Sequence, residues 1–313
     1  MGTPEFAVET LKALVENDYN VVAVVTQPDK PVGRHQTEMQ PSQVKQYAVA
    51  HGLPVLQPEK MKDPEFVEQL RSYNANLQVV VAFRMLPEVV WAMPEYGTFN
   101  VHAALLPQYR GAAPINWAVI NGETQTGVTT FFLDHDIDTG RIILKKTFDI
   151  PDEADVEYVY DGLMHLGAEI CLETLEAIVA ANGHPDSIPQ DSVLDGSAIK
   201  PAPKIFKETC EMDWKKTAKQ VYDFVRGLSP YPGAWTTLVA PDGKETVLKI
   251  YKTRKTGKPG KGIGTITIEG KALCVSAADE QLEIVELQLA GKKRMMARDF
   301  LNGMKQIEDY RVK

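Results

Sequence analysis

The sequence has little cysteine. Its three cysteines, Cys171, Cys210 and Cys274, lie far apart among 313 residues, and none forms a CxxC pair. This spacing argues against a disulfide framework and against a thiolate zinc site. We interpret the three thiols as buried and inert.

Several other signatures are also missing. The sequence has no apolar run of about 18 residues that could span a bilayer, and its start lacks the basic and then apolar layout of a secretion signal. No GxGxxG follows a predicted strand, and neither a Walker loop nor HExxH is present, so nicotinamide binding, phosphoryl transfer and metal catalysis lose their usual support. We expect a cytoplasmic protein without a metal.

The charges are distributed unevenly, and the length suits two domains. Residues 203–313 contain 21 lysines and arginines against 14 acidic residues, a net charge of +7. The preceding residues contain 13 against 28, a net charge of −15. This asymmetry predicts a basic module appended to an acidic one.

The first half alternates β-branched runs with amphipathic segments, which predicts a mostly parallel sheet covered by helices. Residues 20–28 and 78–83 read as strands, and residues 41–52 and 63–74 as helices. Asp63 and Pro64 form a helix start signal that Thr3 and Pro4 repeat. The chain therefore opens on a helix, and we expect that a strand precedes it in a longer reading frame.

The second half predicts a domain boundary. Residues 127–133 and 141–150 read as a strand pair and residues 155–182 as a long helix, followed by a polar segment rich in proline. A helix with Trp214 in its apolar stripe and several short strands then favour a small β-barrel. We predict a catalytic domain at 1–181, a linker at 182–203 and a barrel domain at 204–313.

Asn100 and His102 are the first candidate catalytic pair. Alternate residues of a strand face the same side, so both side chains would project together while Val101 points to the opposite face. An amide donor can stabilise an oxyanion and an imidazole can move a proton, which are the requirements of acyl transfer. A hydrogen-bonded structural pair is the competing interpretation.

An acidic turn supplies a third candidate group. Asp134, Asp136 and Asp138 lie between the two strands of the predicted pair, and a carboxylate that reaches His102 would orient the ring and stabilise its cation. A calcium loop is the alternative, but Thr139 and Lys145 occupy positions that such a loop gives to glycine and glutamate. The calcium interpretation therefore fails.

These residues belong to a longer resemblance. The segments GTPEFAV, VTQPDKPVGR, FNVHAALLPQYRGAAPINWAVINGETQTGVT, DIDTG, LSPYPGAW and LAGKKRM, in this order, resemble the folate-dependent formyltransferase family and cover nearly the whole chain. The late LAGKKRM element and the basic second half are similar to the methionyl-tRNA formyltransferase branch.

The resemblance implies a Rossmann-like formyltransferase domain that uses 10-formyltetrahydrofolate and an OB-like C-terminal domain that helps to hold methionyl initiator tRNA. It places the catalytic groups on Asn100, His102 and Asp138. It also implies a folate-binding loop at Ala104, Leu105, Leu106 and Pro107, although core packing is an equal interpretation for the two leucines. Our candidates for the tRNA surface are Arg34, Lys204, Lys207, Lys292, Lys293 and Arg294.

Two departures from the family pattern are visible. The loop after PVGR keeps Arg34 but has little other positive charge, and the strand before GTPEF is missing. The role of Arg110, as an anchor of its loop or of the substrate, stays open.

Three functions stay in competition. Formylation of methionyl-tRNA on its α-amine, by a monomer, is the first. The second is the same chemistry on a small substrate, such as a purine precursor or a sugar nucleotide, or hydrolysis of formylfolate. The third is a nucleic-acid binder with a degenerate folate domain, against which the intact Asn100, His102 and Asp138 argue.

Overall fold

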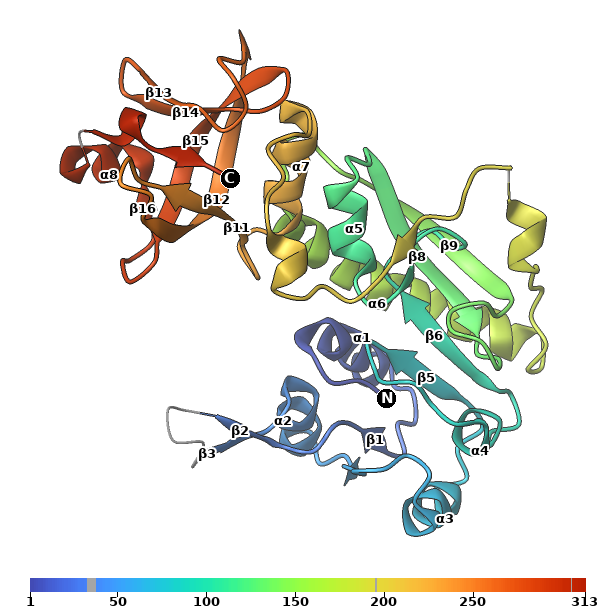
Figure 1. The fold of residues 1–313 in the computed structure, drawn as a ribbon. Helices are drawn as coiled ribbons and strands as arrows, with labels where there is room; N and C mark the ends of the chain where they lie inside the picture. The colour runs from blue at the N-terminus through green and yellow to red at the C-terminus, as the bar shows by residue number, and fades with distance from the viewer. Residues whose placement is uncertain (33–37, 195, 305) are drawn as a thin grey trace. The chain divides into compact units, whose positions relative to one another are not determined.

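The computed structural model describes residues 1–32, 38–194, 196–304 and 306–313 (Figure 1). The chain divides into two compact units. The first unit contains residues 1–111, 125–149 and 160–201, and the second contains residues 112–124, 150–159 and 202–313.

The first unit is built on a mixed sheet of four strands. These strands lie in the order β5 (Gln78–Val81), β6 (Thr98–His102), β8 (Gln125–Phe132) and β9 (Ile142–Asp149). β5 and β6 are parallel, whereas β8 runs antiparallel to both β6 and β9. The expected strand pair is confirmed, but because it adds to β6 as a hairpin, the sheet is mixed and not mostly parallel.

Two smaller pairs accompany this sheet. β1 (Val24–Val25) is parallel to β4 (Val55–Leu56), and β2 (Lys30–Val32) is antiparallel to β3 (Glu38–Gln40). Met1 and Gly2 lie between β1 and β5, because the Gly2 amide donates to the Val25 carbonyl at 3.0 Å and the Val81 amide to the Met1 carbonyl at 2.9 Å. A groove of about 580 Å³ lies beside them.

The helices of the first unit begin largely where the sequence predicts. They are α1 (Glu5–Glu16), α2 (Gln43–Ala50), α3 (Pro64–Ser72) and α4 (Glu88–Trp91). The Asp63 side chain accepts from the Glu65 amide at the start of α3, as expected for an N-cap. Thr3, in contrast, does not cap α1: Pro4 is the N-cap, and the Thr3 hydroxyl accepts from the Gln27 amide.

The long helix α6 (Val156–Ala180) buries an apolar face, and two of its close contacts with the sheet involve a glycine and a threonine. A Cβ on Gly162 would lie 2.2 Å from the Phe148 ring, so the ring packs directly on the helix backbone. Twelve residues further along α6, about three turns, the hydroxyls of Thr130 and Thr174 are 2.8 Å apart in the core. None of the helices within the described ranges is long and apolar enough to cross a membrane.

The segment predicted as a linker is largely part of the first unit. Ile188 exchanges two 2.9 Å backbone hydrogen bonds with Ile142, and the 3-10 helix η1 (Gln190–Val193) begins with a residue that is only 3% exposed. Further on, β10 (Pro201–Ala202) pairs with β7 (Arg110–Gly111). This segment is rich in proline and polar residues, yet it is packed because its polar groups bind the sheet edge. We name residues 182–201 of it the strap.

The second unit contains the predicted antiparallel barrel. Its strands lie in the order β13 (Ile266–Glu269), β14 (Ala272–Ser276), β15 (Glu280–Leu289), β12 (Glu245–Pro259), β11 (Ala234–Val239) and β17 (Arg311–Val312), with β16 (Met295–Met296) paired to β15. The two edges meet next to β13, where the Val312 amide donates to the Gly264 carbonyl at 3.1 Å. The sheet therefore curls until its first and last strands adjoin.

Helices close this barrel unit. α7 (Ala218–Gly227) begins with a capping box between Thr217 and Gln220, and its apolar face joins the core together with Trp214, which precedes the helix. The other helices of the unit are α5 (Pro114–Ile120), α8 (Ala297–Gly303), η2 (Glu208–Cys210) and η3 (Ile307–Asp309).

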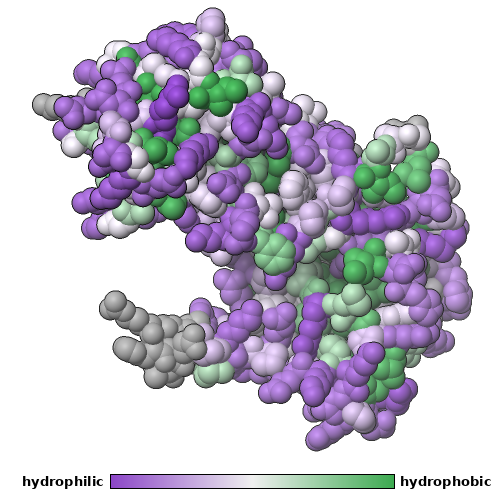
Figure 2. Space-filling model, viewed as in Figure 1, coloured by the Kyte–Doolittle hydropathy of each residue, from purple (hydrophilic) through white to green (hydrophobic). Residues whose placement is uncertain are grey.

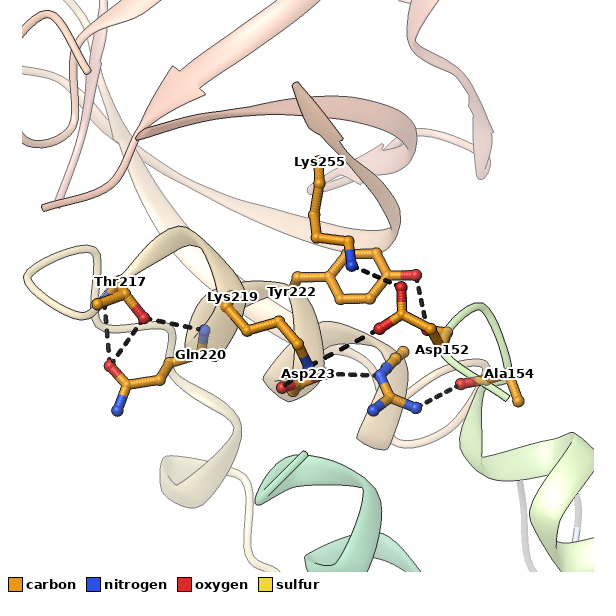
Figure 3. Close-up of polar contacts among 9 residues, drawn as sticks. Asp152, Ala154, Thr217, Lys219, Gln220, Tyr222, Asp223 and Lys255 are labelled. Carbon is orange, nitrogen blue, oxygen red and sulfur yellow. Dashed lines mark hydrogen bonds and ion pairs between the residues drawn. The ribbon is translucent and has the colours of Figure 1, made fainter. Parts of the chain in front are cut away.

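A charged cluster fixes the segment 150–159 to α7 (Figure 3). Asp223 is 4% exposed; its Oδ1 accepts from Arg226 at 2.8 Å and its Oδ2 from Lys219 at 2.5 Å. Arg226 also donates to the Ala154 carbonyl at 2.9 Å. Asp152 pairs with Lys255 at 2.5 Å, and this contact holds the pKa of Asp152 below its usual value.

Candidate functional site

The predicted pair lies on β6, in the middle of the mixed sheet. Asn100 is opposite Phe131 of β8, and His102 is opposite Thr129. The side-chain oxygen of Asn100 is buried, and within the described residues it has no hydrogen-bond partner. An unsatisfied buried polar atom needs an explanation, and a missing ligand is one.

The imidazole of His102 is buried and its tautomer follows from its neighbours. Nε2 lies 2.9 Å from the Tyr109 carbonyl oxygen, which can only accept, so Nε2 carries a proton. Nδ1 lies 3.9 Å from Oδ2 of Asp138. The ring with its proton on Nε2 therefore presents the lone pair of Nδ1 on the side of the Asp138 carboxylate.

Asp138 comes from the turn between β8 and β9, as predicted. Its Oδ2 accepts from the Gly111 amide at 3.0 Å, and its backbone has a φ of +55°, in the left-handed region that glycine, asparagine and aspartate adopt more often than other residues do. Asp134 has a different role, because it accepts from the Asp136 amide and the Thr139 hydroxyl within the turn. Of the three carboxylates, Asp138 is the one in contact with His102.

The predicted folate loop follows His102 and is tied to β8. Thr129 donates its hydroxyl to the Ala104 carbonyl at 2.7 Å and accepts from the Leu106 amide at 3.1 Å. Leu106 is fully buried in a small cluster with Phe131 and Ile142, so its side chain is a core residue. Leu105 is half-buried and stays a candidate for ligand contact, as does Pro107 through its backbone.

The predicted tRNA residues are described by the structure except Arg34, which lies outside the described residues. Lys204, Lys207, Lys292 and Lys293 are exposed. Arg294 is engaged differently: its guanidinium binds both carboxylate oxygens of Glu286, at 2.6 and 2.8 Å. The contribution of Arg294 to a ligand surface is therefore weaker than its charge suggests.

Lys204 and Lys207 line a pocket of about 530 Å³ within the second unit. Exposed aromatic rings accompany them, because Phe206 and Tyr231 are 58% and 82% exposed. Lys249 of β12 adds a third ammonium group to the lining. We name this set the lysine pocket, defined by Lys204, Phe206, Lys207, Tyr231 and Lys249.

The turn that contains Lys292 and Lys293 lies at the same end of the barrel. The Ala290 amide donates to the Val247 carbonyl at 2.9 Å, and Val247 lines the lysine pocket. The turn with Lys292 and Lys293 is therefore hydrogen-bonded, two residues before Lys292, to a residue that lines the lysine pocket.

Sequence reasoning missed several residues of the site. Tyr109 orients the His102 ring through its carbonyl, Gly111 binds Asp138 through its amide, and Gln190 contacts the Asp138 backbone. Thr129, which binds the loop after His102, could have been noticed in the sequence, because it is a polar residue in an apolar strand. Backbone groups such as those of Tyr109 and Gly111 leave no signal in residue type.

These features define a class. A buried imidazole and an amide on one strand, with a carboxylate from a neighbouring turn in contact with the imidazole, are the groups of an acyl-transfer site. The Formyl transferase family matches residues 1–175 and the Formyl transferase C-terminal domain matches residues 204–305. The chain belongs to the formyl transferase family.

Within this family the relatives are specific. The methionyl-tRNA formyltransferase of Parabacteroides distasonis is 59% identical over 100% of this chain and 97% of its own length. That of Bacteroides fragilis is 55% identical over 100% of this chain and 96% of its own length. The chain is thus a member of the methionyl-tRNA formyltransferase group.

Solved structures share the fold at lower identity. WlaRD, a sugar 3N-formyl transferase, superposes with a TM-score of 0.64 at 18% identity, over 93% of this chain and 97% of its own. HypX from Aquifex aeolicus, solved with tetrahydrofolic acid, gives a TM-score of 0.56 at 21% identity, over 82% of this chain and 44% of its own.

Proposed function

We propose that the protein transfers a formyl group from 10-formyltetrahydrofolate to the α-amine of methionyl initiator tRNA. The observation that carries this proposal is the full-length similarity to methionyl-tRNA formyltransferases together with the His102–Asp138 contact of 3.9 Å and the buried, unpartnered side-chain oxygen of Asn100 on the same strand as His102. A site of this kind fits the two reactants, because the attacking amine can donate an N–H to the unpartnered Asn100 oxygen while the Asn100 Nδ2 can donate to the formyl oxygen.

The amine is the nucleophile, and it needs little activation. A free α-amino group has a pKa of about 7.7–8.0, so part of it is uncharged near neutral pH. The new C–N bond forms between the amine and the formyl carbon, and the bond from that carbon to N10 of the folate breaks. One proton leaves the amine, and one reaches N10.

In this proposal the chain's own residues position these events and stabilise their charges. Asn100 donates its amide N–H to the developing oxyanion. His102 takes and returns the proton at Nδ1, where Asp138 stabilises the imidazolium. The loop Ala104–Pro107 flanks the donor through its backbone and through Leu105, since Leu106 packs in the core.

We assign the OB-like barrel to tRNA binding. The lysine pocket and the turn with Lys292 and Lys293 lie at one end of β12, and hydrophilic side chains cover most of the barrel face shown in Figure 2. Ammonium groups bind phosphates, and exposed aromatic rings stack on unpaired bases. A surface of this composition suits the acceptor end of a tRNA, where a helix gives way to single-stranded nucleotides.

The test is direct transfer. The purified protein is incubated with 10-formyltetrahydrofolate and methionyl initiator tRNA, and formylmethionine is measured after the ester bond is hydrolysed. Uncharged tRNA with free methionine is the control, and we expect no product from it. Equal formylation of an amino sugar nucleotide would instead favour the small-substrate function, and formate release without an acceptor would favour hydrolysis.

A further inference from the structure

We infer that Gln190 is a positioning residue that fixes Asp138 for its action on His102, with Arg110 holding the Gln190 amide in the required orientation. This inference rests on the proposed function of the site. It concerns a residue from the strap that composition marks as a linker.

The four hydrogen bonds of Gln190 are all made within the first unit. Its Oε1 accepts from Nε and Nη2 of Arg110 at 3.0 and 2.7 Å. Its Nε2 donates to the carbonyl oxygens of Asp138 and Gly140 at 2.8 and 2.9 Å. The side chain is 3% exposed, so these contacts are shielded from water.

The orientation of this amide is determined by its neighbours. Arginine has donors only, so the atom that faces Arg110 must be the oxygen of Gln190. The two carbonyls on the other side accept only, so they must face the nitrogen. Arg110 therefore fixes which end of the Gln190 amide meets the Asp138 turn, and this assigns a role to an arginine whose function was open.

The contact is made at a stretch of the turn where the backbone has a positive φ and little space for another side chain. Asp138 has a φ of +55°, and a Cβ on Gly140 would lie 1.6 Å from the Phe132 carbonyl oxygen. A backbone in an uncommon conformation persists only where its surroundings hold it. The two carbonyls bound by Gln190 flank this strained stretch, so the amide holds it in place.

The same conformation aims the carboxylate. Oδ2 of Asp138 accepts from the Gly111 amide, and Gly111 directly follows Arg110. The contacts thus run from Arg110 to Gln190, from Gln190 to Asp138, and from Asp138 back to Gly111, the residue after Arg110. Loss of the Gln190 amide opens this loop at the point nearest the reacting groups.

The experiment combines Gln190→Met with a double-mutant cycle. Methionine has a similar length but no donor, and a displacement of about 1 Å at a catalytic group can cost on the order of 10²-fold in rate. We expect kcat for formyl transfer to fall about 10- to 100-fold, with KM for both substrates within a factor of about two. Gln108→Met is the matched control, because Gln108 binds the same strap at the Lys200 amide without contacting Asp138.

The cycle separates positioning from general support of the fold. In an Asp138→Asn background, a residue that acts through Asp138 has little left to affect, so Gln190→Met should change kcat less than about twofold. A purely structural role predicts the same fold loss in both backgrounds and overturns the inference. An unchanged kcat in Gln190→Met alone would also overturn the inference.

Two further measurements keep the outcome unambiguous. Should Gln190→Met fail to fold, Gln190→Glu replaces it, since the carboxylate retains the contact with Arg110 while its second oxygen cannot donate to the turn and faces the two carbonyl oxygens there. Formylation by the unsubstituted chain reports on the proposed function independently. Full activity of Asp138→Asn would overturn both the catalytic assignment and this inference. If Asp138→Asn loses activity but Gln190→Met keeps the parental kcat, only the inference is overturned.

Discussion

The two units each hold one carboxylate in a nearly buried polar network, and the two networks differ in their purpose. Asp223 in the second unit uses both oxygens on cations, Arg226 and Lys219. Asp138 in the first unit is held mainly through its backbone, by Gln190, and Oδ2 has one hydrogen bond and a more distant imidazole.

The difference shows how one fold can use one carboxylate for stability and another for catalysis. A carboxylate whose oxygens are saturated by ion pairs stabilises the packing but has no capacity to respond to a new charge. A carboxylate held by its main chain keeps that capacity and can stabilise a proton that arrives on His102. The comparison predicts that changes in the first network affect rate and that changes in the second affect stability.

The largest effect is expected at Asn100. We predict that Asn100→Ala lowers kcat for formyl transfer by about 10²- to 10³-fold, because one oxyanion donor is lost. Steady-state kinetics with methionyl initiator tRNA measure this. Asn17→Ala, at an exposed helix end of the same unit, should retain the parental rate, and parental activity in Asn100→Ala would refute the assignment.

The second network should respond in stability instead. Asp223→Ala leaves the Arg226 guanidinium, with an 8% exposed side chain, without its carboxylate, and we expect a loss of about 3 kcal/mol in the free energy of unfolding. Urea denaturation measures it. Lys219→Ala removes the half-exposed partner and should cost less than about 1 kcal/mol. The comparison between the units breaks down if Asp223→Ala, assayed while folded, loses formyl transfer as strongly as Asn100→Ala.

A moderate effect is expected at the lysine pocket. Replacement of Lys204, Lys207 and Lys249 by alanine should weaken tRNA binding about tenfold or more near physiological salt and reduce the steepness of log affinity against log salt by about two. Filter binding at several salt concentrations measures both. The matched control replaces Lys258, Lys261 and Lys313, which are paired with Glu269 or Glu245. An equal loss of tRNA affinity in this control would show that only the net charge of the protein matters.

The smallest effect concerns the thiols. Burial raises the pKa of Cys171 to about 12, and it also raises the pKa of Cys210 and of Cys274. We expect no reaction of the native protein with a thiol reagent at pH 8, and three reactive thiols after denaturation, measured by absorbance. A rapidly reacting thiol in the folded protein would contradict the interpretation of all three as inert.

Local patterns predicted much of this protein. Strand alternation placed Asn100 and His102 on one face, the Asp63–Pro64 signal fixed the start of α3, and the charge asymmetry pointed to the basic barrel unit. The first two predictions succeeded because each depends on neighbours within a few residues, and the third because a sum of charges needs no knowledge of the fold. The direction of the sheet was harder, since pairing of β8 with β6 joins residues about 30 positions apart.

The residue types and their order determined which groups of this chain are able to do chemistry: an amide, an imidazole, three turn carboxylates and a set of lysines. The residue types alone left three turn carboxylates open and the family resemblance selected Asp138, but only the tertiary structure decided that Leu106 belongs to the core and that Gln190 closes the network. The physical reason is that these roles depend on backbone carbonyls and amides, which every residue has, and on contacts between segments 50 to 80 residues apart in the chain.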